Sequence, residues 1–392
     1  MNLIETYALN CGAKIDKPYI YSTFFPIPLE RYITFHTDEA EQSKSYEYWQ
    51  DVINIITPVL KNNNITIVQV GDANNREMHD CVSFRGQTSL NQLAYIMERS
   101  MLHVGPDGFL LHLASYYDIP IVGLYSPYFI ECNKPFFGSA SKHILLSSYD
   151  RAKQKPSYSP EENPKTINLL LPEEIASSVL KLLNINFDFP FDTVFIGKKY
   201  SGFNIQESIP NNPTILFNPE NPVEIRTDLG YDDGSLHNQL AHYKKSIVII
   251  SKTINFDILR RFKDNIHSIV VRILGGDQKE LISKIVELGK NIILVSPLPE
   301  EEIQKLKHIY YEFGNIHPQE SIGIDKINEL KKDSSYLYYR SSKITAVNGK
   351  YYYSQASAEV GIPMDNPHEY QKVIDSQLFW DNAHCFMIVK KK

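Results

Sequence analysis

Hydrophobic and polar positions along this chain follow two alternating patterns. Short continuous apolar runs, for example at 246–250 and 291–295, are separated by longer segments in which apolar residues recur at helical spacing, for example at 90–97. Continuous apolar runs are typical of parallel strands that are covered on both faces, and the helical segments are typical of the crossovers between such strands. The pattern predicts an α/β fold with parallel sheets.

The predicted elements fall into two series, joined by a connection at 151–168 in which prolines stand among charged residues. Because a residue before proline is disfavoured in a helix, this connection should be extended. A helix at 171–183, with a proline in its first turn, should close the first series. We therefore expect two domains, at 1–185 and 186–392.

Each series predicts a Rossmann-like sheet flanked by helices. In the first, we expect strands at 32–36, 65–70, 101–104 and 120–124 and helices at 48–61, at 90–97 and after 108. In the second, we expect strands at 193–196, 213–217, 246–250, 268–273 and 291–295 and helices at 237–244, 257–263, 277–288 and 299–313. A hairpin that turns at Asn348-Gly349 and a closing helix and strand should complete the chain.

Composition narrows the class of protein. At 392 residues, with 43% hydrophobic and 22% charged residues, the chain is long enough for two globular domains. Its formal net charge of -6 gives no general attraction to nucleic acid or to anionic membranes. The 4 cysteines are widely spaced, which predicts neither a zinc site nor a disulfide framework. We expect no leader and no membrane span, and therefore a cytoplasmic protein.

The segment 86–114 is the best candidate for a ligand site. Its helix and short strand lead into the turn Gly105-Pro106-Asp107-Gly108, directly before a second helix. Free N–H groups and the positive dipole end at the start of a helix attract anions, and open α/β sheets bind ligands at the carboxyl ends of their strands. Asp107 is therefore either a helix cap or an acceptor for ligand hydroxyls.

The residues around this turn follow a known pattern. Gly86-Gln87-Thr88-Ser89-Leu90 is followed by Asp107-Gly108-Phe109-Leu110-Leu111-His112-Leu113-Ala114 and then by Pro120-Ile121-Val122-Gly123-Leu124. In order and spacing these residues resemble the nucleotide-binding half of the heptosyltransferase-like glycosyltransferases, glycosyltransferase family 9. That family's pattern reads Gly-x-Thr-Ser-Leu and then Asp-Ser/Thr-Gly-x-x-His-Leu-Ala.

The resemblance extends over roughly residues 30–150. After the first strand, a polar loop that begins at Thr37 ends in Ser43-Lys44, where the family places a lysine that meets the donor phosphates. One departure is Phe109, which replaces a small residue and could pack on a base or a sugar. A second is that only about thirty residues precede the first matching strand, too few for the acceptor domain that the family places there.

The resemblance implies a GT-B arrangement of two Rossmann-like domains, here with the donor domain first in the chain. It implies a glycosyltransferase that moves a sugar from a nucleotide-diphosphate sugar to a hydroxyl-bearing acceptor such as a glycan, and it leaves the oligomeric state open. The implied donor-site residues are Thr37, Ser43, Lys44, Gly71, Gln87, Thr88, Asp107, Gly108, Phe109 and His112. Outside the resemblance, the place of Arg226 between a predicted strand and a predicted helix of the second domain makes it a candidate anion contact.

Such a transfer needs charge compensation at the leaving diphosphate and a base for the acceptor proton. No Asp-x-Asp chelate is evident, and the adjacent Asp232 and Asp233 would point apart on a strand, so we expect no metal and no cofactor. Asp228, expected in a loop before the helix at 237–244, is the predicted base. His36 is the competing candidate, and a buried structural histidine is an equal interpretation of it.

Two other functions are open. The protein could be a catalytically inactive nucleotide-binding or glycan-binding protein or scaffold, or it could glycosylate modified DNA bases through basic clusters such as Lys244-Lys245. An enzyme should present Lys44, Thr88, Asp107 and His112 together, with a carboxylate or histidine of the second domain opposite them.

Overall fold

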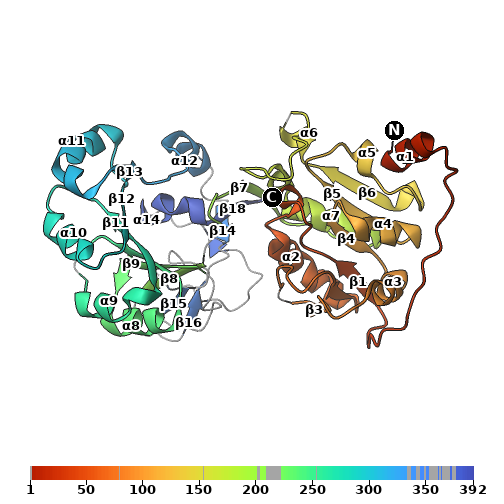
Figure 1. Cartoon of the computed structure of the whole chain (residues 1–392), viewed down its shortest axis with the longest axis horizontal. Helices are drawn as coiled ribbons and strands as arrows, with labels where there is room; N and C mark the ends of the chain where they lie inside the picture. The colour runs from red at the N-terminus through yellow and green to blue at the C-terminus, as the bar shows by residue number, and fades with distance from the viewer. Residues whose placement is uncertain are drawn as a thin grey trace. The chain divides into compact units, whose positions relative to one another are not determined.

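The computed structural model describes residues 2–78, 80–152, 154–200, 204–208, 222–252, 254–332, 337–340, 345–347, 350–352, 361, 363, 371–372 and 377–392. The chain forms two compact units, Met1–Pro190 and Phe191–Lys392 (Figure 1). Each contains a parallel sheet with flanking helices. The predicted α/β class, with a parallel sheet and flanking helices in each of two units, is confirmed.

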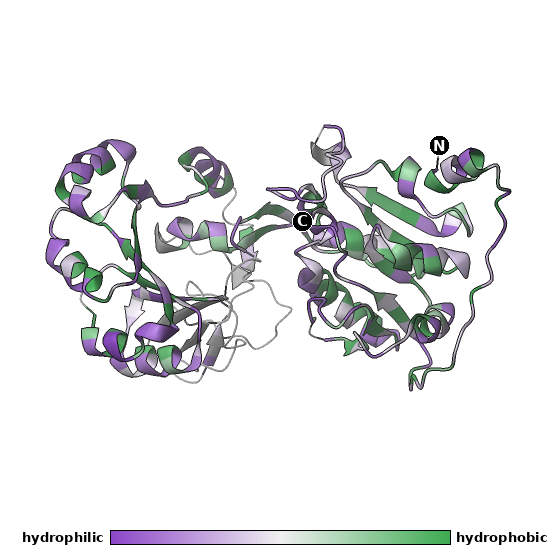
Figure 2. Cartoon of the chain, viewed as in Figure 1, coloured by the Kyte–Doolittle hydropathy of each residue, from purple (hydrophilic) through white to green (hydrophobic). Residues whose placement is uncertain are grey.

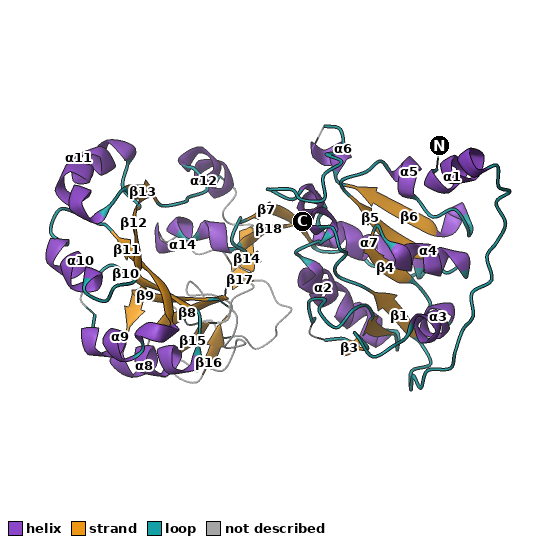
Figure 3. Cartoon of the chain, viewed as in Figure 1, coloured by secondary structure: helices purple, strands orange, loops and turns teal. Residues whose placement is uncertain are grey.

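The first unit has a six-stranded parallel sheet in the order β3-β2-β1-β4-β5-β6 (Figure 3). Its strands are β1 Tyr32–Phe35, β2 Thr66–Gln69, β3 Val82–Ser83, β4 His103–Pro106, β5 Ile121–Tyr125 and β6 His143–Ser147. The strand order reverses between β1 and β4, and their carboxyl ends flank the crevice in which open α/β sheets bind ligands. This switch point is where the predicted site residues should lie.

Helices cover both faces of this first sheet. They are α1 Leu3–Cys11, α2 Trp49–Asn62, α3 Leu90–Glu98, α4 Phe109–Tyr116, α5 Ile130–Asn133, α6 Tyr149–Ala152 and α7 Pro172–Leu182, with the short helices η1 Gln42–Lys44, η2 Ala140–Lys142 and η3 Thr166–Leu169. Tyr32 of β1 donates to the carbonyl of Ile96 in α3 at 2.8 Å, whereas Phe35 packs on Trp49 of α2 with ring centroids 6.3 Å apart. Figure 2 shows the strands between these layers as mostly hydrophobic.

The second unit has a six-stranded parallel sheet whose strands follow one another in chain order, from β8 to β13. They are β8 Asn204–Ser208, β9 Val223–Tyr231, β10 Ser246–Ile250, β11 Ile266–Arg272, β12 Asn291–Ser296 and β13 Ile316–Pro318. The helices α8 Asp233–His242, α9 Phe256–Arg261, α10 Lys279–Val286 and α11 Glu300–Tyr310 share one hydrophobic core with alternate residues of these strands. Because the strand order never reverses, this sheet has no switch point of the kind found between β1 and β4.

A smaller antiparallel sheet, in the order β17-β14-β18-β7, belongs to the same unit. Its strands are β7 Phe191–Ile196, β14 Leu337–Arg340, β17 Gln371–Lys372 and β18 Met387–Lys391. The helices α12 Ile324–Lys331, α14 Gln377–Asp381 and η7 Ala383–Cys385 share a hydrophobic core with this sheet. The short helices η4 Lys263–Asn265 and η5 Tyr311–Phe313 follow α9 and α11. β15 Thr345–Val347 pairs antiparallel with β16 Lys350–Tyr352, whereas the predicted turn at Asn348-Gly349 lies outside the described residues.

The structure differs from the sequence prediction at β9. The strand predicted at 213–217 lies outside the described residues, whereas 223–231, which we expected to be loop, is a strand. Within the described residues, no helix combines the length and apolar composition that crossing a membrane requires.

Candidate functional site

The candidate site begins with an ion pair at the switch point of the first sheet. Lys44 follows β1 and Asp107 follows β4, and Lys44 Nζ lies 3.3 Å from Asp107 Oδ2. Glu41 Oε1 is also 3.3 Å from Nζ, and Asn133 Nδ2 donates to Asp107 Oδ2 at 2.9 Å. Burial disfavours the charge on Lys44, but Asp107 and Glu41 outweigh it and raise the pKa of Lys44 above its usual value. The lysine is therefore held in its charged form.

Asp107 does not cap the helix that follows it. The N-cap residue of α4 is Gly108, and no side chain caps this helix end. The Asp107 carboxylate is directed instead to Lys44 and Asn133. The helix-cap alternative is therefore wrong, and the role of Asp107 as an acceptor for ligand hydroxyls stays a prediction.

Two further polar side chains lie near this ion pair. Burial lowers the pKa of His112. The negative charge of Asp107 raises this pKa and the positive charge of Lys44 lowers it, but burial has the largest effect, so the half-buried ring is neutral at pH 7. The hydroxyl of Tyr125, at the end of β5, is buried and has no hydrogen-bond partner within the part of the chain that is described. Such orphan groups are uncommon in folded proteins and are typical of sites that a water or ligand completes.

A chain of hydrogen bonds runs along the ends of β1 and β4 to the same place. Thr34 Oγ1 lies 3.0 Å from His103 Nδ1, and His103 Nε2 lies 3.0 Å from His36 Nδ1. His36 Nε2 in turn lies 3.0 Å from Glu39 Oε1. Burial, reinforced by His36, lowers the pKa of His103 well below its usual value, so that ring is neutral. Of these four residues, Glu39 reaches the surface, with 25% of its side chain exposed.

Two glycines make room for these side chains. A Cβ atom built on Gly105 would overlap the ring of His36, and one built on Gly108 would overlap the carboxylate of Glu39. Gly108 has a φ of -176°, which any residue adopts, so the requirement there is space rather than backbone conformation. His36 and Glu39 thus lie directly against the turn between β4 and α4.

Substituting Gly105 by alanine should lower the free energy of unfolding by about 1–3 kcal/mol, because the methyl group must displace His36 from a packed position. Urea denaturation followed by tryptophan fluorescence measures this change. Gly275→Ala is a matched control, since a Cβ there meets only Asp277 Oδ1 at an ordinary 3.4 Å. Equal stability of the two variants would contradict the close contact.

The loop between β1 and α2 is fixed by its own hydroxyls and by a tryptophan. Trp49 Nε1 donates to the Thr37 carbonyl at 2.9 Å, and Ser43 Oγ donates to the Ser159 carbonyl at 2.8 Å. Thr37 Oγ1 donates to Asp38 Oδ2 at 2.7 Å. In this structure the two predicted donor-site hydroxyls, those of Thr37 and Ser43, therefore hold the loop that presents Lys44.

Gly71 and Phe109 border the same crevice. Gly71, two residues after β2, has a φ of +128°, which favours glycine, and a Cβ there would lie 4.0 Å from Cβ of His36. Phe109, the first residue of α4, leaves 54% of its surface exposed. An exposed aromatic ring beside a helix N-terminus is available to stack on a base or a sugar.

Gln87 and Thr88 are not joined to this cluster by any contact that the structure shows. Gln87 is exposed, and its Nε2 donates to the Ser83 carbonyl at 3.2 Å. Thr88 is half-buried, and the residue after it, Ser89, caps α3 by accepting from the backbone N–H of Gln92. The structure thus brings together Lys44, Asp107 and His112, while the two donor contacts at 87–88 stay predictions.

Asp228 and Arg226 lie within β9 of the second unit and not in the loop where we expected them. Arg226 Nε and Nη2 donate to the two oxygens of Asp228 at 2.8 and 2.9 Å, and Arg272 Nη1 donates to Asp228 Oδ2 at 2.9 Å. Burial alone would raise the pKa of Asp228, but the two guanidinium groups outweigh it and hold this pKa below its usual value. With 0% of its side chain exposed, Asp228 has the surroundings of a structural ion pair.

Asp232 and Asp233 serve the start of α8. Asp232 Oδ2 accepts from the backbone N–H of Ser235 at 2.7 Å, which makes it the N-cap. Asp233 accepts from Asn255 Nδ2 at 2.8 Å and from the hydroxyl of Tyr231. Among the residues that the structure describes, no group of three or more His, Cys, Asp or Glu side chains is placed to hold a metal ion.

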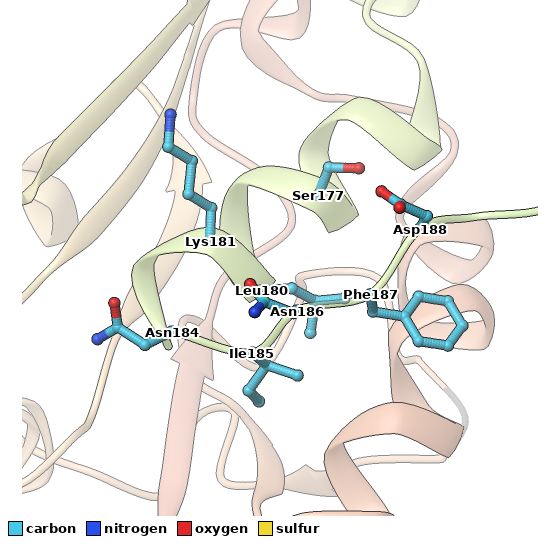
Figure 4. Close-up of a pocket in the computed structure, with 8 residues that line it drawn as sticks. All are labelled: Ser177, Leu180, Lys181, Asn184, Ile185, Asn186, Phe187 and Asp188. Atoms are coloured by element: carbon cyan, nitrogen blue, oxygen red, sulfur yellow. The ribbon is translucent and has the colours of Figure 1, made fainter.

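A hollow of about 770 Å³ lies apart from this cluster, at the end of α7 (Figure 4). Its lining residues are Ser177, Leu180, Lys181, Asn184, Ile185, Asn186, Phe187 and Asp188. None of them is a predicted site residue, and the switch-point cluster stays the candidate site.

Six residues of the cluster were missed in the sequence: Thr34, Glu39, Glu41, His103, Tyr125 and Asn133. His103 could have been found, because it lies in the strand predicted at 101–104, which is adjacent to the strand that ends at His36. Asn133 gave no such signal, since it lies 26 residues beyond Asp107 in a short helix.

Comparison with known proteins agrees with the sequence pattern in the first unit. Residues 48–163 match the model of glycosyltransferase family 9 (heptosyltransferase). The match includes Asp107, Gly108 and His112 and begins after His36 and Lys44. A search among curated proteins found no match.

Solved structures similar to this chain include a family 9 glycosyl transferase from Veillonella parvula (19% identity, 40% of this chain and 46% of that one, TM-score 0.32). Others are ADP-heptose lipopolysaccharide heptosyltransferase II of E. coli (16%, 46% and 51%, TM-score 0.31) and E. coli heptosyltransferase WaaC with ADP (15%, 45% and 54%, TM-score 0.32). The chain spans about half the length of these structures. The predicted resemblance of the first unit to the glycosyltransferases of family 9 is confirmed by the match at residues 48–163.

Proposed function

We propose that the first unit binds a nucleotide-diphosphate sugar at the switch point of its sheet, and that the protein transfers the sugar to a hydroxyl-bearing acceptor such as a glycan. The observation that supports this most directly is the buried pair of Lys44 and Asp107 between β1 and β4. One partner supplies positive charge for a diphosphate, and the other supplies an acceptor for sugar hydroxyls. The match at 48–163 supports the same class of reaction.

Each residue has a definite task in this proposal. Lys44 and the free N–H groups at the start of α4 stabilise the negative charge that develops on the leaving diphosphate. Asp107, held by Asn133, accepts hydrogen bonds from the sugar, and neutral His112 donates one to the phosphate side. The exposed ring of Phe109 stacks on the base or the sugar. The proposal needs no metal ion and no cofactor.

The acceptor side is assigned to the second unit, and the candidates for removal of the acceptor proton are Asp228 of that unit and His36 of the first. Asp228 or His36 could take the acceptor proton only by exchanging the hydrogen bonds that it makes now. Arginines bind both oxygens of Asp228, so this carboxylate is not free to accept a proton from an acceptor. This observation supports a second candidate function. That function is binding of a nucleotide sugar without transfer.

A thermal-shift screen with ADP, UDP, GDP, CDP and their sugar conjugates tests the binding step. A ligand at one hundred times its Kd should stabilise the wild type by about 2.7 kcal/mol. Asp107→Ala should lose this response, and Asp118→Ala, which removes a surface partner of Lys142, should keep it. Absence of any response in the wild type would refute the proposal.

The release of nucleoside diphosphate in the presence of acceptor glycans separates the two candidate functions. Transfer that persists in EDTA is the expected result. Binding with no transfer to any acceptor, and no slow hydrolysis of the donor, would favour the binding function over the enzyme.

A further inference from the structure

The loop after β1 places a carboxylate where a donor phosphate would be expected. Glu39 lies against Gly108, the residue from which α4 starts, so closely that a side chain at 108 would overlap it. The start of a helix is a preferred position for phosphate, because its N–H groups are free and its dipole is positive there. Glu39 therefore brings a negative charge of the protein itself to that position.

The position of Glu39 is imposed by its buried neighbours. Thr34 Oγ1 can donate to His103 Nδ1, His103 Nε2–H to His36 Nδ1, and His36 Nε2–H to Glu39, at 3.0 Å in each case. In this direction of hydrogen bonds the Glu39 carboxylate is the final acceptor. His36 and His103 are 1% and 0% exposed, so neither ring is free to turn. Glu39 is thus held in place against the start of α4.

The nearby positive charge does not compensate for Glu39. Lys44 is shared between Asp107 and Glu41, at 3.3 Å from each. A diphosphate that enters this site meets Asp107 and Glu41, which share Lys44, and in addition the carboxylate of Glu39. Like charges brought together in a partly buried site weaken binding strongly, unless one of them moves away.

The same contact accounts for the glycine at 108. The family pattern has Ser or Thr after the aspartate, and here the space for that side chain is filled by the carboxylate of Glu39. A hydroxyl can donate a hydrogen bond to a phosphate, whereas a carboxylate cannot. With the Glu39 carboxylate in place of a Ser or Thr hydroxyl, the start of α4 presents a hydrogen-bond acceptor to a phosphate where a donor would otherwise lie.

We propose that Glu39 is an internal anion that occupies the phosphate position at the start of α4, so that a donor diphosphate binds only when this side chain is displaced. Glu39 then determines how tightly the site accepts nucleotides. The inference rests on the proposed donor function and adds a residue that controls it.

Isothermal titration of the full chain with ADP, UDP, GDP and CDP tests this inference. Glu39→Gln keeps the shape and the acceptor oxygen for His36 but removes the charge, and it should bind its preferred diphosphate about 10–100-fold more tightly than the wild type. Glu98→Gln, at the end of α3, removes the same charge outside the site and should leave the affinity unchanged.

The outcomes separate this inference from the proposed function. If the wild type and Glu39→Gln bind with equal affinity, or if the variant binds more weakly, the inference is refuted while donor binding stands. If no diphosphate binds to either protein, both fail, because the inference requires binding to the variant.

A double-mutant cycle checks the contact without any ligand. Gly108→Ser should lower the melting temperature in the wild type and should be tolerated in a Glu39→Ala background, where the space is free. Additive effects of the two substitutions would show that Glu39 does not occupy this position.

Discussion

Asp228→Ala is expected to destabilise the second unit by about 3–5 kcal/mol, because it leaves two arginines without the carboxylate between them. Arg226 is 4% exposed, and Asp228 accepts from both Arg226 and Arg272. For a unit of this size the loss corresponds to a fall in melting temperature of roughly 10 °C. The result would assign Asp228 a structural role.

Fluorescence can measure this change in one unit at a time, because the chain has 2 tryptophans. Trp49 is buried in the first unit and Trp380 in the second, so a Trp49→Phe background reports on the second unit. The control is Asp257→Ala, which removes an exposed partner of Arg260 and should cost less than about 0.5 kcal/mol. If Asp228→Ala keeps its stability but loses sugar transfer, Asp228 is the base after all.

Lys44→Met is expected to weaken the binding of nucleoside diphosphates by about 10–100-fold, since it removes a charge-assisted contact to the phosphates. Titration of the variant and of wild type with the same diphosphate measures the loss. The control is Lys142→Met, which disrupts an exposed ion pair with Asp118 and should bind as the wild type does.

The same substitution leaves the buried Asp107 without its cation, so folding must be measured alongside binding. Adding Asp107→Asn to Lys44→Met should recover stability without recovering affinity, because the neutral amide no longer needs a charged partner. Unchanged affinity in a folded Lys44→Met variant would remove Lys44 from the donor site.

The position of the candidate site was predictable because its parts are local in sequence. The strands at 32–36 and 101–104 end in His36 and shortly before Asp107, and the rule that ligands bind where strand order reverses brings these two ends together. Apolar runs such as 246–250 are continuous, so β10 was predicted with its bounds as the structure has them. In both cases the signal lies within a short stretch of chain.

The interactions that decide the roles of Asp228 and Glu39 could not be predicted in this way. β9 alternates apolar and charged residues, and its Arg226 is buried against Asn382, which lies 156 residues away along the chain. Glu39 depends on His36 and through it on His103, which lies 67 residues beyond His36. Side-chain contacts between residues so far apart in the sequence depend on how whole elements pack, and they produce no periodic pattern in the sequence.

The antiparallel sheet of the second unit constrains the order in which that unit can be completed. Among the described strands, β18 lies between β7 and β14 and is the one that pairs with β7, so the strand that opens the unit gains this partner only when residues 387–391 have been synthesised. The parallel strands β8 to β13 join neighbours that are close in sequence and can assemble as they emerge. Until then β7 has an unpaired edge, and a protein shortened before β18 would present β7 and β14 to other chains as open templates for aggregation.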